Sequence, residues 1–263
     1  LAFQSFRLFG DREPARKLPE GEKIWTIGFH RIISIARTLH SDYPELTRIL
    51  LARASYFGMQ RAIVSLATTY LVSQIGMSSG AVSTVLIVAY VMGIPGALLV
   101  HYLSGKQIEA RTILLSCLYI LVSSFALIPF VFYRHSDVIA AYMYGALWGL
   151  LTGALVSVDK AFFSTFIPGG MESELFGMYA FTNSILEWLP PLVFTAFNEG
   201  MGTLRWALVP LASFYIIGIV VLSTLDVQAG RERVASTLVK RRMAGAHVTS
   251  QSSSGDNDVM YPI

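Results

Sequence analysis

Apolar residues gather in six long runs along the chain, and short polar stretches separate these runs. A membrane-spanning helix needs about 20 mainly apolar residues, because the hydrocarbon core is about 30 Å thick and a helix rises about 1.5 Å per residue. Continuous runs of this length lack the alternation typical of transmembrane barrel strands. The pattern therefore predicts an all-α membrane protein with six transmembrane helices, over residues 49–73, 81–103, 112–133, 138–158, 176–197 and 204–225.

More polar sequence flanks this predicted six-helix bundle of residues 49–227. Residues 1–48 are predicted to form a cytosolic loop with an amphipathic helix over 23–40, and 228–263 a disordered, serine-rich cytosolic tail. The helix at 23–40 fits two positions equally well, on the cytosolic membrane surface or packed on the loops of its own protein. Its apolar face comprises Trp25, Phe29, Ile32, Ala36 and Leu39.

Basic residues are distributed unevenly between the two sides of the predicted bundle. Of the 20 Lys and Arg residues, sixteen lie on the side of the chain ends, two lie opposite, and two lie within the first run. Loops rich in Lys and Arg stay in the cytosol, so both ends of this chain are predicted to be cytosolic. Because the chain starts at Leu1 and not at methionine, we expect its amino-terminal part to be missing.

The composition excludes several classes of function. Hydrophobic residues make up 54% of the chain and charged residues 14%, compared with about 25% charged residues in soluble domains. No basic stripe with interleaved aromatics predicts nucleic-acid binding. Cys117 is the single cysteine, and no Cys/His cluster has zinc spacing. The sequence contains no phosphate-binding glycine loop, nucleophile elbow or zinc-protease motif, so we expect no enzyme, no cofactor and no metal.

Two ionisable residues fall near the middle of predicted helices, where a charge costs about 2.5 kcal/mol or more. Arg61 lies in the first run and Glu187 in the fifth, at similar depth from the cytosolic side. The two residues are candidates for binding a zwitterionic solute, with Arg61 facing a carboxylate and Glu187 an ammonium group, or for carrying a proton at Glu187. A static pair that joins two helices and two residues without contact are the alternatives.

Other polar and small residues add to these candidates. Asn183 lies four residues before Glu187, on the same helical face, and is a candidate to support it or to bond another helix. Arg53 is close enough to the cytosolic end of its run to reach the headgroups, so we interpret it as an anchor. Asp159 and Lys160 end the fourth run and are candidates for a cytosolic gate.

Glycine and proline mark further features of the helices. Gly145, Gly149 and Gly153 have four-residue spacing and predict close packing of another helix. Pro190 and Pro191 predict a bend late in the fifth run.

A long stretch carries a specific resemblance. Residues 149–194, GLLTGALVSVDKAFFSTFIPGGMESELFGMYAFTNSILEWLPPLVF, combine a glycine-rich helix, a basic residue, an Ile-Pro-Gly hinge, acidic residues, Phe-Gly-x-Tyr and a Trp-x-x-Pro-x-x-Phe pattern. This pattern resembles the autophagy-related vacuole effluxer family of the major facilitator superfamily. The matching positions are Lys160, Pro168, Gly169, Glu172, Glu174, Phe176, Gly177, Tyr179, Trp188, Pro191 and Phe194. The similarity extends over residues 18–226.

The resemblance implies a twelve-helix carrier of which this chain forms the C-terminal half, helices 7 to 12, with a missing six-helix N-terminal half. It further implies a multi-pass protein of the vacuole membrane that exports amino acids to the cytosol. Lys160, Glu172 and Glu174 at the hinge are gate candidates. The chain departs from the family pattern at Phe57 and Arg61. A carrier for another small solute and a non-transporting scaffold or inactive half-carrier are the alternatives.

Overall fold

The computed structural model describes residues 24–132, 138–201 and 204–236, with side chains described from residue 33 onward except at 201, 204 and 205. This part of the chain is helical and contains no strand, which confirms the predicted all-α class. The elements are α2 (Ile24–Asp42), α3 (Pro44–Ser73), α4 (Ser79–Gly105), α5 (Ala110–Val131), α6 (Val138–Ser164), α7 (Glu172–Thr182), α8 (Leu189–Met201), α9 (Leu204–Ala207), η1 (Val209–Leu211), α10 (Ala212–Ser223) and a last helix, Val227–Ser236.

Within the described ranges, three helices are long and apolar enough to cross a membrane, namely α4, α5 and α6. A fourth candidate arises if the bent pair Val209–Ser223 and Val227–Ser236 forms one span. The predictions of helices at 81–103, 112–133 and 138–158 are therefore confirmed to within a few residues, apart from an α6 that extends to Ser164. The count of six spans stays a prediction.

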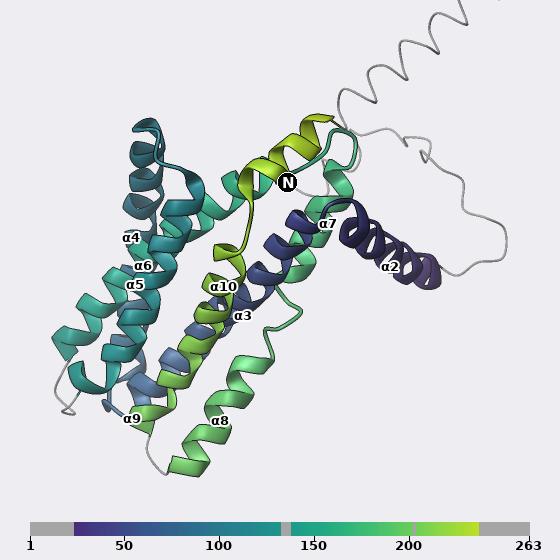
Figure 1. The fold of residues 1–263 in the computed structure, drawn as a ribbon. Coiled ribbons are helices and arrows are strands. Elements are labelled where there is room, and N and C mark those ends of the chain that lie inside the picture. Colours follow the sequence, from purple (N-terminus) through teal and green to yellow (C-terminus); the bar gives the residue numbers. More distant parts are fainter. Residues whose placement is uncertain (1–23, 133–137, 202–203, 237–263) are drawn as a thin grey trace, which may run out of the picture.

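Helix α3 lies at the centre of the molecule, where it contacts α2, α4, α6, α7, α8 and α10 (Figure 1). It has 30 residues and begins at Pro44, five residues before the predicted start. Proline is favoured in the first turn, where its missing N–H costs no helical hydrogen bond. Most of α3 is buried, including the polar residues Arg53 and Gln60, so the neighbouring helices must supply partners for its polar side chains.

Helices α4 and α6 approach one another closely, as the glycine spacing predicts. An ideal Cβ on Gly149 would lie 1.9 Å from the carbonyl oxygen of Ala89, and one on Gly153 would lie 2.0 Å from that of Gly93. Only residues without a side chain allow the two backbones this distance. Together with α5, these helices form an apolar group on one side of α3 and α10 (Figure 1).

The predicted fifth helix over 176–197 is wrong as a single helix, because the structure breaks it into α7 and α8. Residues 183–188 between them form turns with hydrogen bonds such as Glu187 N–H to Ser184 O (3.3 Å). Pro190 and Pro191 stand in the first turn of α8 and have no N–H to donate to the carbonyls four residues earlier. The helix therefore breaks before the prolines and does not bend at them.

The two flanking helices lie at the same end of the molecule as the start of α3 (Figure 1). The predicted helix over 23–40 is present as α2, with Leu39 buried and Ile35 packed on the core, so the described end of α2 packs on the protein. The prediction of disorder from residue 228 differs from the structure at 228–236, which are helical. Residues 1–23, 133–137 and 237–263 lie outside the described residues.

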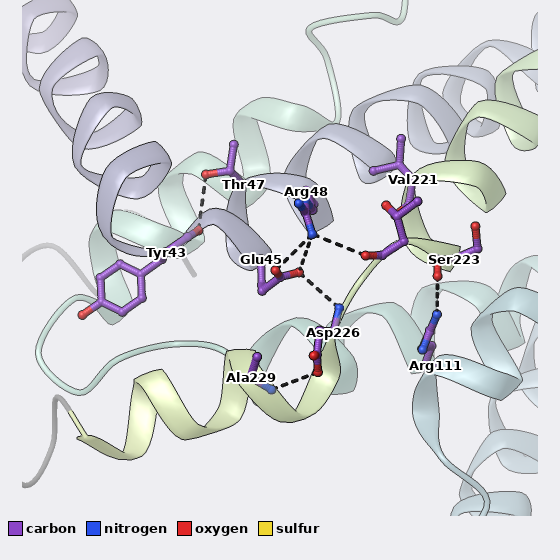
Figure 2. A network of polar contacts seen from close by, with 10 residues as sticks. Tyr43, Glu45, Thr47, Arg48, Arg111, Val221, Ser223, Asp226 and Ala229 are labelled. Carbon is purple, nitrogen blue, oxygen red and sulfur yellow. Dashed lines mark hydrogen bonds and ion pairs between the residues drawn. The ribbon is translucent and has the colours of Figure 1, made fainter.

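A polar network fixes the bend of 62° between α10 and the last helix (Figure 2). Arg48 Nη1 contacts the Glu45 carboxylate at 3.1 Å and donates to Thr224 O at 3.3 Å, while the Asp226 N–H donates to Glu45 Oε2. Arg111 Nη2 donates to Ser223 O at 2.7 Å. Two cations thus satisfy the terminal carbonyls of α10, where the helix dipole favours positive charge.

Candidate functional site

A buried ion pair joins α3 to α6. Arg53 Nε lies 3.0 Å from Asp159 Oδ2, and the two side chains are only 2% and 1% exposed. The Nε–H does not point at that oxygen, so the contact is an ion pair without a hydrogen bond. The Asp159 carboxylate also accepts hydrogen bonds from the hydroxyl groups of Tyr56 and Tyr179, the latter at 2.6 Å. These partners satisfy a charge that burial would otherwise destabilise.

The other side of the Arg53 guanidinium group contacts the end of α7. Nη1 donates to Asn183 Oδ1 at 2.7 Å and to Thr182 Oγ1 at 3.3 Å. The guanidinium carbon lies 3.4 Å from the ring centroid of Tyr179 and 3.9 Å from that of Phe57, so the planar group is held between two aromatic rings. One side chain of α3 therefore links α6 to the last residues of α7.

Two interpretations from the sequence change here. The interpretation of Arg53 as a headgroup anchor is wrong, because Arg53 is buried and its charge is paired within the protein. Asp159 does not end a span next to a loop but lies inside α6, five residues before its end, and its partner is Arg53. Its neighbour Lys160 is exposed, so the structure separates these two gate candidates.

Arg61 and Glu187 come together, although they are more open to solvent than Arg53 and Asp159. Arg61 Nε lies 3.8 Å from Glu187 Oε2, and the side chains are 57% and 44% exposed. Arg61 follows Arg53 and Phe57 at four-residue spacing on one face of α3, and Glu187 lies in the break between α7 and α8. The long separation and the exposure leave both charges accessible to a further charged group.

The segment of the break contacts α3 through its backbone as well. An ideal Cβ on Gly58 would lie 3.0 Å from both the Cβ and the carbonyl oxygen of Leu186, so a larger residue would push the two segments apart. Leu186 precedes Glu187 directly. Gly58 therefore allows the close approach that places Glu187 beside Arg61.

A second polar network on α3 was not predicted from the sequence. Gln60 donates to Thr152 Oγ1 of α6 at 2.6 Å and accepts from the Tyr215 hydroxyl group of α10 at 2.9 Å. Gln60 follows Tyr56 by four residues, so a polar stripe could have been read along α3 at helical spacing. This network joins three helices next to the Arg61–Glu187 pair.

The hinge between α6 and α7 carries the remaining gate candidates. The Gly170 N–H donates to both carboxylate oxygens of Glu172 at 2.9 Å, and Gly170 has a φ of 86°, which favours glycine. Glu172 is exposed, and Glu174 is half-buried in the first turn of α7, where the helix dipole favours an acidic residue. The described residues hold no cluster of His, Cys, Asp and Glu able to bind a metal ion.

Comparison with known proteins finds a family model and named relatives that the chain matches. The family model described as "Vacuole effluxer Atg22 like" matches residues 2–235. "Autophagy-related protein 22" of Coccidioides immitis is 27% identical over 212 residues, which are 76% of this chain and 35% of that protein. "Autophagy-related protein 22-1" of Aspergillus niger is 25% identical over 216 residues, 77% of this chain and 34% of that protein. The chain thus spans about a third of the length of the curated relatives that it matches.

Proposed function

Because this chain belongs to the Atg22-like vacuole effluxer family, we propose that it is part of a secondary transporter that exports amino acids from the vacuole to the cytosol during autophagy. Family membership and three apolar helices support a multi-pass membrane protein. The six runs of the sequence form six spans in this proposal, with α7 and α8 as one broken span and both chain ends in the cytosol. The chain forms the C-terminal half of a twelve-helix carrier, whose N-terminal half lies outside it.

The observation that carries this proposal is the accessible charge pair at a break in a helix. A charged pair at the mid-membrane depth that the sequence predicts is too costly to face lipid, so in this proposal the half-exposed Arg61–Glu187 pair faces water or another part of the protein. Carriers commonly place their solute sites where a discontinuous helix meets its neighbours. A zwitterionic amino acid matches the pair, with its carboxylate on Arg61 and its ammonium group on Glu187.

The hinge at 165–171 is the cytosolic gate in this proposal. Lys160, Glu172 and Glu174 lie on the two helices that this hinge joins, α6 and α7, at their proposed cytosolic ends. The buried Asp159 of α6 supports α7, because its carboxylate accepts a hydrogen bond from the Tyr179 hydroxyl group. Movement of α7 against α6 would open a path next to the charge pair.

The experiment is amino-acid release from isolated vacuoles that contain the complete transporter or its Glu187→Gln variant. We expect the variant to lower the initial release rate about tenfold or more, because a charge-assisted hydrogen bond to the ammonium group is lost. Glu109→Gln is the matched control, because Glu109 is exposed next to α5 and away from the pair.

Three outcomes separate the alternatives. Release that only the Glu187 variant loses supports an exporter with this pair in its solute site. Release that the variant keeps supports the exporter and makes the Arg61–Glu187 pair a structural contact. Release from neither, with the protein at the vacuole, contradicts amino-acid export and favours another solute or a non-transporting role.

A further inference from the structure

We propose that Arg53 is the positioning residue of the solute site: it holds the broken span in place and thereby sets the position of Glu187 relative to Arg61. Arg53 can play this part only if the Arg61–Glu187 pair binds solute as proposed above. Its own side chain is buried, and its polar contacts are with Asp159, Thr182 and Asn183. Its effect passes through the last residues of α7 and the turns that follow.

Arg53 is held in a fixed orientation by its contact with α6. The Asp159 carboxylate pairs with its Nε at 3.0 Å, and the rings of Phe57 and Tyr179 confine the plane of the guanidinium group. Asp159 is in turn fixed by two tyrosine hydroxyl groups. A planar cation with this many partners has a defined orientation, which a lysine could not reproduce.

The guanidinium group of Arg53 in turn binds the start of the break directly. Asn183 is the residue that follows α7, and its side-chain oxygen accepts from Arg53 Nη1 at 2.7 Å. From Asn183 the chain needs only the short turns through Ser184 and Leu186 to reach Glu187. The break has no continuous helical hydrogen bonding of its own, so contacts to α3 must hold it in position.

The contacts between α3 and the break follow the same order along both segments. Arg53 contacts Asn183 at one end, Gly58 contacts Leu186 in the middle, and Arg61 contacts Glu187 at the other end. The first contact is partly buried and 2.7 Å long, whereas the last is half-exposed and 3.8 Å long. The shorter contact therefore anchors the segment, and the exposed pair is left free to open for a solute.

The experiment compares Arg53→Lys, Glu187→Gln and their double variant in vesicles that contain the complete transporter, with Arg37→Lys as the control for the same change at an exposed position. We expect Arg53→Lys to raise KM about tenfold, with a smaller change in maximal rate, because a displaced Glu187 weakens solute binding. The double variant should be no worse than Glu187→Gln alone, since both changes act on one contact. Effects that multiply would overturn the proposal.

A distance measurement tests the same idea without transport. Spin labels at Ile185, in the break, and at the exposed Tyr102 of α4 would be placed in a protein whose Cys117 is replaced by serine. We expect one narrow distance distribution in the parent and a broader one after Arg53→Lys. Asn183→Ala removes the acceptor of the Arg53 hydrogen bond but keeps the buried Arg53–Asp159 pair, and it should broaden the distance distribution as well. This variant tests the proposal even if Arg53→Lys does not fold. Unchanged distributions in both would contradict the proposal.

The two measurements keep the two proposals apart. A parent protein that transports no amino acid, with distances that respond to both variants, would refute the proposed function and leave Arg53 as the residue that positions the break. If Glu187→Gln lowers transport but Arg53→Lys changes neither KM nor the distance distribution, the proposed function is supported and the positioning role of Arg53 is refuted.

Discussion

Two groups of helices are held together by different contacts. One group comprises α4, α5 and α6, and the other comprises α3, α7 and α8. In the first group, backbone meets backbone at Gly149 and Gly153, and serine hydroxyl groups bond carbonyls of their own helices, as Ser116 does with Thr112 O. In the second, polar side chains cross between helices, as Arg53 does to Thr182 and Asn183, and the same guanidinium group pairs with Asp159 of α6 in the first group. The first group is long and unbroken, and the second is interrupted.

The difference shows which group is able to rearrange. Close backbone contact depends on shape over many residues and leaves few other arrangements of similar energy. Polar contacts across a broken helix are few, directional and exchangeable for contacts with a charged solute or water. We therefore expect the apolar group to move as a unit and the break near Glu187 to be the segment that changes.

The largest expected effect comes from breaking the buried ion pair. Asp159→Asn would leave the Arg53 charge buried without its counterion, which typically costs about 3–5 kcal/mol of unfolding free energy. Denaturation of the purified protein in detergent measures this loss. Lys160→Gln removes one charge from the adjacent exposed position and is the matched control. Equal stabilities of the two variants would show that the pair does not hold α3, α6 and α7 together.

A smaller loss is expected in the apolar group. Gly149→Ala places a methyl group 1.9 Å from the Ala89 carbonyl oxygen, so α4 and α6 must separate. Overpacking of this kind costs about 1–3 kcal/mol, measured in the same denaturation experiment. Gly80→Ala in α4 is the control, because its added Cβ meets nothing within 4 Å and alanine favours a helix. A variant at Gly149 as stable as the control would contradict backbone contact as the basis of this packing.

The apolar group is the part that could be predicted from the sequence. Hydrophobic runs give the bounds of α4 to within two residues and the start of α6, and glycine spacing gives the packing face of α6, because both signals are local. The Arg61–Glu187 contact was also among the predicted alternatives, since two opposite charges at similar depth have reason to pair.

The buried cluster was missed for a physical reason. The first apolar run begins at residue 49, whereas α3 begins at Pro44, so Arg53 lies about 14 Å along its helix. Asp159 stood one residue beyond the predicted end of its run, although α6 continues to Ser164. Polar residues near a helix end make an apolar run shorter than the helix itself. Because this holds for both α3 and α6, the sequence pattern does not predict the pairing of Arg53 with Asp159. Likewise, the prolines predict a bend in a continuous helix, whereas the structure breaks that helix before them, at 183–188.

The smallest expected effect concerns Lys160, which is exposed although the adjacent Asp159 is buried. Lys160 is exposed, so Lys160→Gln should change the unfolding free energy by no more than about 0.5 kcal/mol. If the hinge between α6 and α7 is the cytosolic gate, the same variant and Glu174→Gln should still slow amino-acid release from vacuoles, by about twofold for a weak surface interaction. Slower release at unchanged protein abundance would separate a moving contact from a structural one. Unchanged release in both variants would contradict the gate and confine the functional charges to the Arg61–Glu187 pair and its buried support.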